Sequence, residues 1–326
     1  MSTATQLYIT TLLVYLLIDV MAGWGLNLQF GTAGLLNFGF IVYQAAGAYT
    51  VAVLSLGSSS SSGGYQHYLG GAKLPFPLPL IAAVAVGVVL SLVVGLIGLR
   101  RLRSDYQAVI MLVVSLIAAD IATAQIGLVN GPQGLSLIPQ PFAGLGLSQD
   151  VYNWVFTGMC AAACAGVYVL VRGVEQSPFG RALRALRDNE AAARSLGENV
   201  DRLRLTAFAI GGGIAALSGG LFAEFLTSWA PASWTYAETF VFFTAIIVGG
   251  VASRRGVFLG TLLVPVALQY AVTYLPQVGH VGLIEALQWV VVGVVTILFI
   301  AFRPKGLLPE QKRVYPRRAT DPDRVR

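Results

Sequence analysis

The feature that most constrains the fold of this chain is a series of nine long apolar runs. A helix needs roughly 20 residues to cross a hydrocarbon core about 30 Å thick, and most of the runs reach that length. Open strands would leave backbone groups unpaired in lipid, so only helices are credible. We therefore expect an all-α polytopic membrane protein with about nine (8–10) transmembrane helices. The expected spans are 7–28, 33–56, 78–99, 106–128, 151–171, 205–227, 238–253, 256–275 and 282–302.

Two of these spans are irregular, because 33–56 starts in a glycine-rich bend and 238–253 is short, so either is a candidate for a broken or re-entrant segment.

The composition of the chain agrees with the membrane class. The chain is 56% hydrophobic and only 11% charged, whereas soluble domains carry about 25% charged residues. The net charge of +6 does not indicate nucleic-acid binding, since the basic residues flank the apolar runs.

Basic residues mark alternate connections between the spans. They are Arg100, Arg101, Arg103, the arginines between 172 and 204, Arg254, Arg255, Arg303, Lys305, Lys312, Arg313, Arg317 and Arg318. The other connections, 57–77, 129–150, 228–237 and 276–281, contain one lysine or arginine, Lys73. Positive charge favours the cytoplasmic side, so we expect the N-terminus outside and the C-terminus in the cytoplasm of a multi-pass plasma (inner) membrane protein. Residues 1–303 would form one transmembrane domain, with a cytoplasmic loop at about 172–204 and a basic cytoplasmic tail at 304–326.

The loop between residues 177 and 205 has the signals of a short helix outside the bilayer. Ser177 suits an N-cap, Pro178 the first helical turn and Gly197 the left-handed position after a helix. Four arginines fall near one helical stripe: Arg181, Arg184, Arg187 and Arg194. The alternative is an ordinary positively charged loop.

Five blocks of sequence carry a family resemblance. Residues 189–197, NEAAARSLG, resemble the Glu-Ala-Ala…Gly loop by which ABC-importer permeases dock on their ATPase subunits. The other blocks are GLNLQFGTAGLLNFGFIVYQAAGAY at 25–49, LRRLRSDYQAVIML at 99–112, NGPQGLSLIP at 130–139 and AFRPKGLLP at 301–309. Together, over about 25–308, they resemble the branched-chain amino acid ABC transporter permease family, of the LivM type.

The resemblance implies a transport subunit that moves branched-chain or other neutral amino acids, with ATP hydrolysed elsewhere. Implied partners are a second, LivH-like permease, two ABC ATPase subunits and an external solute-binding protein. The residues implied in ATPase docking are Arg181, Arg184, Arg187, Glu190, Ala191, Ala192 and Gly197. Two alternatives stay open: an ABC permease for urea or short amides, and a stand-alone secondary solute carrier.

The expected solute pathway follows the glycine-rich stretch near the second span. A helix break there would expose backbone N–H groups, and two amide side chains lie in the same apolar setting. The pathway candidates are Gly31, Gly34, Asn37, Gly39 and Gln44. The alternative for the glycines is close helix packing.

No motif in the sequence indicates catalysis, a cofactor or a metal. There is no phosphate-binding loop, so the chain itself is not expected to hydrolyse ATP. Cys160 and Cys164 lack neighbouring histidines or acids and are expected to be packing residues. Among acidic residues, Asp19 and Asp120 lie deepest within apolar runs, while Glu224, Glu238 and Glu285 lie near span ends and are expected at the membrane interface.

The predicted orientation can be tested by cysteine labelling in a background without Cys160 and Cys164. Cysteines at Ser60 and Ser148 should react with an impermeant reagent in intact cells. A cysteine at Ala319 should react only after permeabilisation, because the basic tail is predicted on the cytoplasmic side. Labelling of the Ala319→Cys variant in intact cells would reverse the topology.

Overall fold

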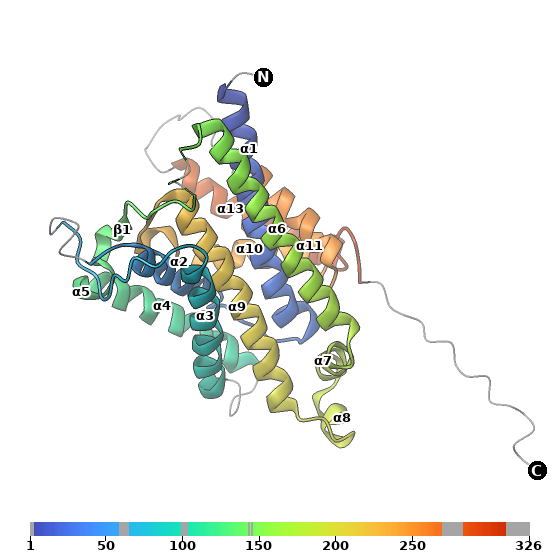
Figure 1. Cartoon of the computed structure of the whole chain (residues 1–326). Coiled ribbons are helices and arrows are strands. Elements are labelled where there is room, and N and C mark those ends of the chain that lie inside the picture. The colour runs from blue at the N-terminus through green and yellow to red at the C-terminus, as the bar shows by residue number, and fades with distance from the viewer. Residues whose placement is uncertain are drawn as a thin grey trace, which may run out of the picture.

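A computed structural model describes residues 3–58, 65–98, 104–142, 144, 146–268 and 283–310. It is a helical bundle with one two-stranded ribbon (Figure 1). The longer helices are α1 (Thr3–Asn27), α2 (Ile41–Ser55), α3 (Leu78–Gly98), α4 (Ser104–Ala124), α6 (Gln149–Gln176), α7 (Pro178–Asp188), α9 (Val200–Leu226), α10 (Tyr236–Gly249), α11 (Arg254–Thr261) and α13 (Leu283–Phe302). Shorter elements are α5 (Ile126–Val129), α8 (Glu190–Ser195), strands β1 (Leu135–Ser136) and β2 (Ser228–Trp229), 3₁₀ turns at Gly131–Gln133 and Pro231–Ser233, and π-helical turns at Leu28–Thr32 and Leu262–Leu268.

The all-α membrane class is confirmed, since six helices in the described part of the chain are long and apolar enough to cross a membrane. The helix α2, with 15 residues, is shorter, because the expected span 33–56 is non-helical over most of residues 33–40. The expected span 238–253 ends at Gly249. The count of nine and the orientation of the termini stay predictions. The labelling sites Ser60 and Ala319, the residues Arg100, Arg101 and Arg103, positions 269–282 and the tail after Glu310 lie outside the described residues.

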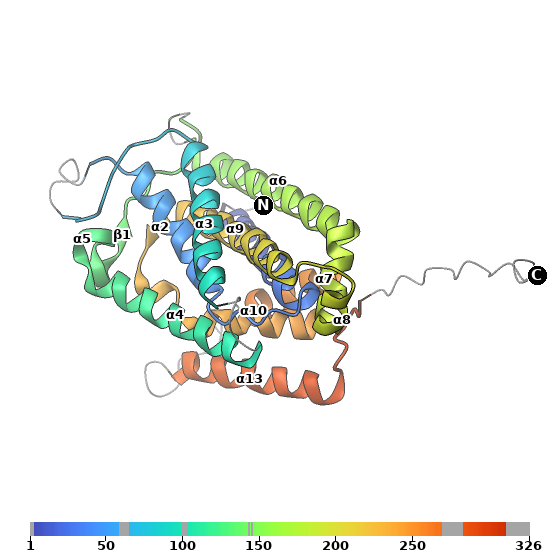
Figure 2. The same cartoon turned by 90° about the horizontal axis from the view of Figure 1, so that it is seen from below.

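The helix α9 forms the centre of the bundle, and it packs against α1, α2 and α3 (Figure 2). Small residues make this packing close. A Cβ added to Gly219 of α9 would clash with the carbonyl oxygen of Gln44 on α2, and one added to Gly212 would clash with Ser91 on α3. Side-chain-free positions of this kind allow helix backbones to approach each other in lipid. The group α2–α3–α9 is therefore held by backbone contacts.

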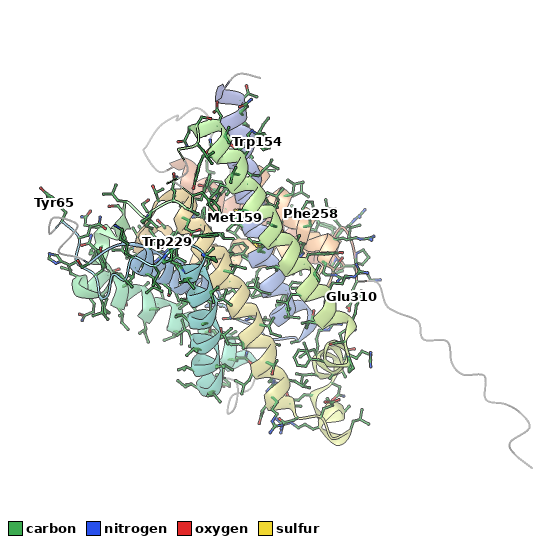
Figure 3. The ribbon with its side chains drawn as sticks, in the orientation of Figure 1. Tyr65, Trp154, Met159, Trp229, Phe258 and Glu310 are labelled. Atoms are coloured by element: carbon green, nitrogen blue, oxygen red, sulfur yellow. The ribbon has the colours of Figure 1, made fainter. Side chains whose placement is uncertain are left out.

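The bundle has two chemically different ends. At one end, which we call the docking end, α7 and α8 follow α6 and precede α9 (Figure 1). At the other, the ribbon end, β1 pairs antiparallel with β2, Leu135 opposite Trp229. Figure 3 shows Trp154 near the start of α6 and Glu310 beside the far end of the same helix. The docking candidates and the ribbon thus lie on opposite sides of the apolar layer.

The close packing of α9 predicts a difference between two identical substitutions. Gly219→Ala should overpack the contact with α2 and cost about 1–3 kcal/mol, which would lower the thermal unfolding midpoint of the detergent-purified protein. Gly166→Ala in α6, where an added Cβ has nothing within 4 Å, should be neutral or slightly stabilising. Equal midpoints for the two variants would contradict the packing described here.

Candidate docking and pathway site

The helix α7 begins and packs as its sequence dictates. The hydroxyl of Ser177 accepts a hydrogen bond from the backbone N–H of Gly180 at 3.3 Å, and Pro178 occupies the first turn. The apolar face of α7 is buried through Leu183 and Leu186. Of its arginines, Arg181 is exposed at the docking end, whereas Arg184 and Arg187 are half-buried.

A second helix, α8, follows after a break, so the expectation of one arginine stripe running on to Arg194 is wrong. Asn189 takes an extended conformation, and its side chain accepts a hydrogen bond from the N–H of Ala192 at 3.0 Å, which caps α8 as a separate helix. Gly197 then adopts φ +85°, the left-handed conformation expected after a helix.

The surface of α8 is small and partly apolar. Ala193 is buried against the bundle, whereas Ala191 and Ala192 are exposed. Leu196, just after the helix, is 81% exposed, which is unusual for a leucine outside the apolar layer. Such a protruding side chain beside two small residues forms a contact surface that no other described segment of the chain covers.

Glu190 connects α8 to the start of α9. Its carboxylate forms an ion pair with Arg204 of α9 at 2.6 Å and with Arg194 of α8 at 3.0 Å. Arg204 is 12% exposed and Glu190 is 39% exposed, so the pair is shielded from water on the α9 side only. This carboxylate therefore joins α8 to α9.

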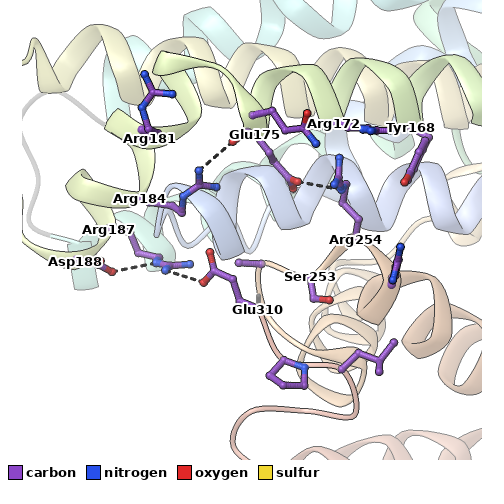
Figure 4. Close-up of a pocket in the computed structure, with 15 residues that line it drawn as sticks. Tyr168, Arg172, Glu175, Arg181, Arg184, Arg187, Asp188, Ser253, Arg254 and Glu310 are labelled. Atoms are coloured by element: carbon purple, nitrogen blue, oxygen red, sulfur yellow. Dashed lines mark hydrogen bonds and ion pairs between the residues drawn. The ribbon is translucent and has the colours of Figure 1, made fainter. Parts of the chain in front are cut away.

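A basic cleft of about 920 Å³ opens beside α7 (Figure 4). Six arginines and three acidic residues line it: Arg172, Arg181, Arg184, Arg187, Arg254, Arg255, Glu175, Asp188 and Glu310. Arg184 donates to the backbone carbonyl of Glu175 at 3.0 Å, and Arg254 forms an ion pair with the Glu175 carboxylate at 3.1 Å. The excess of arginines leaves the cleft positively charged.

The segment 303–310 forms one wall of the basic cleft. The N–H groups of Leu307 and Leu308 donate to the carbonyls of Val248 and Gly249, each at 2.9 Å. Gly250 has φ +128°, and a Cβ there would collide with the Leu308 carbonyl. The block AFRPKGLLP is thus fixed to the end of α10, where Glu310 reaches Arg187 at 3.0 Å.

The bend between α1 and α2, residues 28–40, is stabilised by buried amide side chains. Asn37 is fully buried, donates to the Gln29 side chain at 2.9 Å and accepts from the N–H of Gly39 at 3.2 Å. Gln29 in turn donates to the carbonyl of Phe208 on α9 at 2.9 Å. Sequence reasoning missed Gln29, although a glutamine within an apolar run was a usable signal. Gln44 is buried on α2, where its backbone meets Gly219.

The docking and pathway candidates meet at Arg187. Its guanidinium donates a hydrogen bond to the carbonyl of Gly31 in the bend. Gly34 has φ +72°, and a Cβ there would lie 3.0 Å from Cγ of Arg187. Sequence reasoning treated α7 and the bend as separate sites. The structure joins them by one side chain.

The acidic residues differ from expectation in two places. Asp120 is exposed on α4. Glu224, expected at the membrane interface, is 2% exposed and buried within the protein, because the end of α9 is covered by neighbouring segments. Among the described residues no group of His, Cys, Asp or Glu could hold a metal ion, and Cys160 and Cys164 are free and buried.

Comparison with known proteins identifies the class. Residues 8–300 match the family described as the permease component of the branched-chain amino acid transport system. The chain belongs to this family. It is accordingly a permease of the ABC-importer class rather than an enzyme, and a multi-pass protein of the plasma (inner) membrane. Membership of the family implies a partner permease and ATPase subunits.

Three relatives illustrate the similarity. The permease is 30% identical over 315 residues to the high-affinity branched-chain amino acid transport system permease protein LivM of Escherichia coli (strain K12), covering 90% of this chain and 68% of that protein. It is 27% identical over 333 residues to the probable LivM of Methanocaldococcus jannaschii, covering 94% and 95%. The probable LivH of that organism is 24% identical over 273 residues, covering 83% and 82%. No solved structure matches the chain significantly.

The amide network predicts a stability effect for Asn37. Asn37→Ala should leave the Gly39 N–H and the Gln29 carbonyl oxygen buried without their partner, at a cost of about 1–3 kcal/mol. The thermal unfolding midpoint of the purified permease should fall accordingly. The matched control is Asn153→Ala, which removes an exposed hydrogen bond to Gln149 and should have little effect. An unchanged midpoint for Asn37→Ala would argue against the network.

Proposed function

We propose that this chain is the LivM-type subunit of an importer that carries branched-chain or other neutral amino acids inward. In this proposal the ribbon end faces outside and the docking end faces the cytoplasm. ATP is hydrolysed by two partner subunits, a LivH-like chain completes the membrane part, and an external protein delivers the solute. The extended similarity to LivM proteins, with a weaker similarity to a LivH protein, supports this arrangement.

The observation that carries the proposal is the contact of Arg187 with the bend. Arg187 lies on α7, beside the exposed surface of α8, and its guanidinium bonds to Gly31 where α1 gives way to the bend. A force applied to α7 from the cytoplasm would therefore reach, through one side chain, the π-helical turn Leu28–Thr32, which leads into the non-helical residues 33–40. This is the mechanical connection that an ATP-driven permease needs.

The proposed ATPase docking surface combines an apolar contact with positive charge. Ala191, Ala192 and Leu196 present the apolar part, and the basic cleft supplies Arg181, with Arg184 and Arg187 along its wall. Glu190 and Gly197 shape the surface rather than contact the partner, because Glu190 is occupied by two arginines and Gly197 provides the left-handed turn.

The solute path is proposed to run beside the bend, past Gly31, Gly34, Asn37, Gly39 and Gln44. Buried amide dipoles suit a zwitterion, because they stabilise charge without binding it as an ion pair would. Movement of the bend would break or remake the bonds among Asn37, Gln29 and Gly39 and so open the path. Under this proposal Asn37 variants that still assemble show an altered ranking of competing solutes.

Two alternatives are weighed against this function. Membership of the ABC permease family excludes a stand-alone secondary carrier. An ABC permease for urea or short amides remains the second candidate on sequence grounds. A path lined by amides alone would accept these neutral solutes, so the ribbon end, which receives the solute first, has to discriminate between them.

Uptake measurements test the docking proposal. In cells that express the complete set of subunits, Glu190→Lys and Gly197→Val should each reduce ATP-driven leucine uptake by about tenfold or more, as expected when two sites lose about 1–3 kcal/mol of coupling. Insertion in the membrane and solute binding to the external protein should be unchanged. The matched control is Glu198→Lys, because Glu198 is exposed and has no ion pair in the described part of the chain.

Arg187→Gln separates docking from transmission within the same experiment. It should still recruit the ATPase, because the α8 surface, Arg181 and Arg184 remain and the Arg187 guanidinium is already bonded to Gly31 and Glu310 within this chain. Uptake should nevertheless fall relative to ATP hydrolysis, because the bond to Gly31 is weakened. Normal uptake in Glu190→Lys, Gly197→Val and Arg187→Gln cells, with ATPase recruitment unchanged, would refute the assignment of this end.

A further inference from the structure

A second cavity, of about 300 Å³, lies at the ribbon end. It is formed where α2 ends, where α3 begins and where the last turns of α9 meet the segment after β1. Pockets for small organic ligands begin at about this volume. In the proposed orientation this cavity faces outside, on the side from which the solute enters.

The floor of the cavity holds a buried carboxylate. Glu224 on α9 lines it and is 2% exposed, and its Oε2 atom has no hydrogen-bond partner within the described part of the chain. An unpaired carboxylate oxygen is costly to bury and marks a place where a cationic or donor group is expected. Within a cavity, that group can come from a ligand.

The rim of the cavity holds the opposite charge. Lys73 is exposed and adopts φ +49°, and its backbone N–H is fixed to the Leu56 carbonyl at 3.1 Å. It is the one lysine or arginine in the connections 57–77, 129–150, 228–237 and 276–281. The ion pairs found among described residues do not include Lys73 or Glu224. The cavity therefore presents an ammonium and a carboxylate that do not neutralise each other.

Most of the other residues that line the cavity are apolar, with Ser55 and Gln140 the polar ones. Phe76 and Phe142 line it with their rings edge to face, 5.0 Å between centroids, and Pro75, Pro79 and Pro139 extend the surface. An aliphatic side chain fits such a wall, because it loses water without leaving a polar group unpaired.

From this arrangement we infer that the cavity is a receiving site for a zwitterionic α-amino acid with an apolar side chain. The solute's ammonium binds Glu224, its carboxylate binds Lys73 and its side chain lies against Phe76 and Phe142. Urea and short amides carry no formal charges and cannot satisfy both groups. The inference rests on the proposed import function and selects its substrate class.

Direct binding to the assembled complex tests the site. Radiolabelled L-leucine is titrated onto the purified permease–ATPase complex in nanodiscs, without the external binding protein. Glu224→Gln should raise the leucine Kd by about tenfold or more, as expected for loss of one member of a desolvated charge pair. Lys73→Gln, at the exposed rim, should raise it by about two- to fivefold. Asp150→Asn, a carboxylate at the same end that does not line the cavity, is the matched control and should bind as wild type.

Competition experiments test which groups of the solute the site recognises. Isoamylamine lacks the carboxylate and isocaproate lacks the ammonium, so each should compete far more weakly than L-valine, and urea should not compete. Leucine affinity that is unchanged in both variants, absence of millimolar leucine binding to the wild type, or effective competition by urea would each overturn the site. Should Glu224→Gln fail to assemble, the exposed Lys73→Gln variant decides alone.

ATP-driven uptake distinguishes the site from the import function. It is measured with the same variants reconstituted in sealed proteoliposomes together with the external binding protein. Wild-type leucine uptake together with unaltered binding in both variants refutes the receiving site and leaves the import function standing. Leucine binding that depends on Glu224 and Lys73, without ATP-driven uptake by the wild type, supports the site and refutes the function.

Discussion

Inside hydrocarbon, backbone that leaves the helical conformation must find its hydrogen-bond partners within the protein, and this requirement governs the region where α1 ends. The chain meets it with side-chain amides. Asn37 and Gln29 connect the bend to itself and to α9, while Asn27 accepts from the N–H of Ala252 at 2.9 Å. The bend is thus the meeting point of α1, α2, α9 and the turn before α11, and the positions of α7 and the segment 303–310 follow from it.

Rigid and adjustable parts of the molecule differ in how they are held. Where α2, α3 and α9 meet, glycines bring one backbone against another, and such contacts tolerate little relative movement. The bend and the turn at Gly250 depend in addition on hydrogen bonds, from the Asn37 and Gln29 side chains in the bend and from the N–H groups of Leu307 and Leu308 beside Gly250. A conformational change concentrated in these two segments would leave the central group of helices intact.

Sequence reasoning correctly predicted the features that depend on residues close together in the chain. The apolar runs predicted the helical membrane class, and Ser177, Pro178 and Gly197 predicted the capping around α7 and α8, because caps are decided by neighbours in the chain. It missed what depends on distant segments. The break at Asn189 was hidden within a helical pattern, and the bond from Arg187 to Gly31 joins positions 156 residues apart. Glu224 was misplaced because nearness to a span end does not reveal the cover supplied by other loops.

Under the proposed function, the division of the loop between α6 and α9 into two helices would give a docked partner two separate levers. Pressure on α8 is passed through Glu190 to the first turn of α9, which belongs to the rigid group. Pressure on α7 is passed through Arg187 to the bend. Asn189 lies at the pivot between them. A rotation of the partner, rather than a simple push, would drive the two levers by unequal amounts and so turn the bend against a stationary frame.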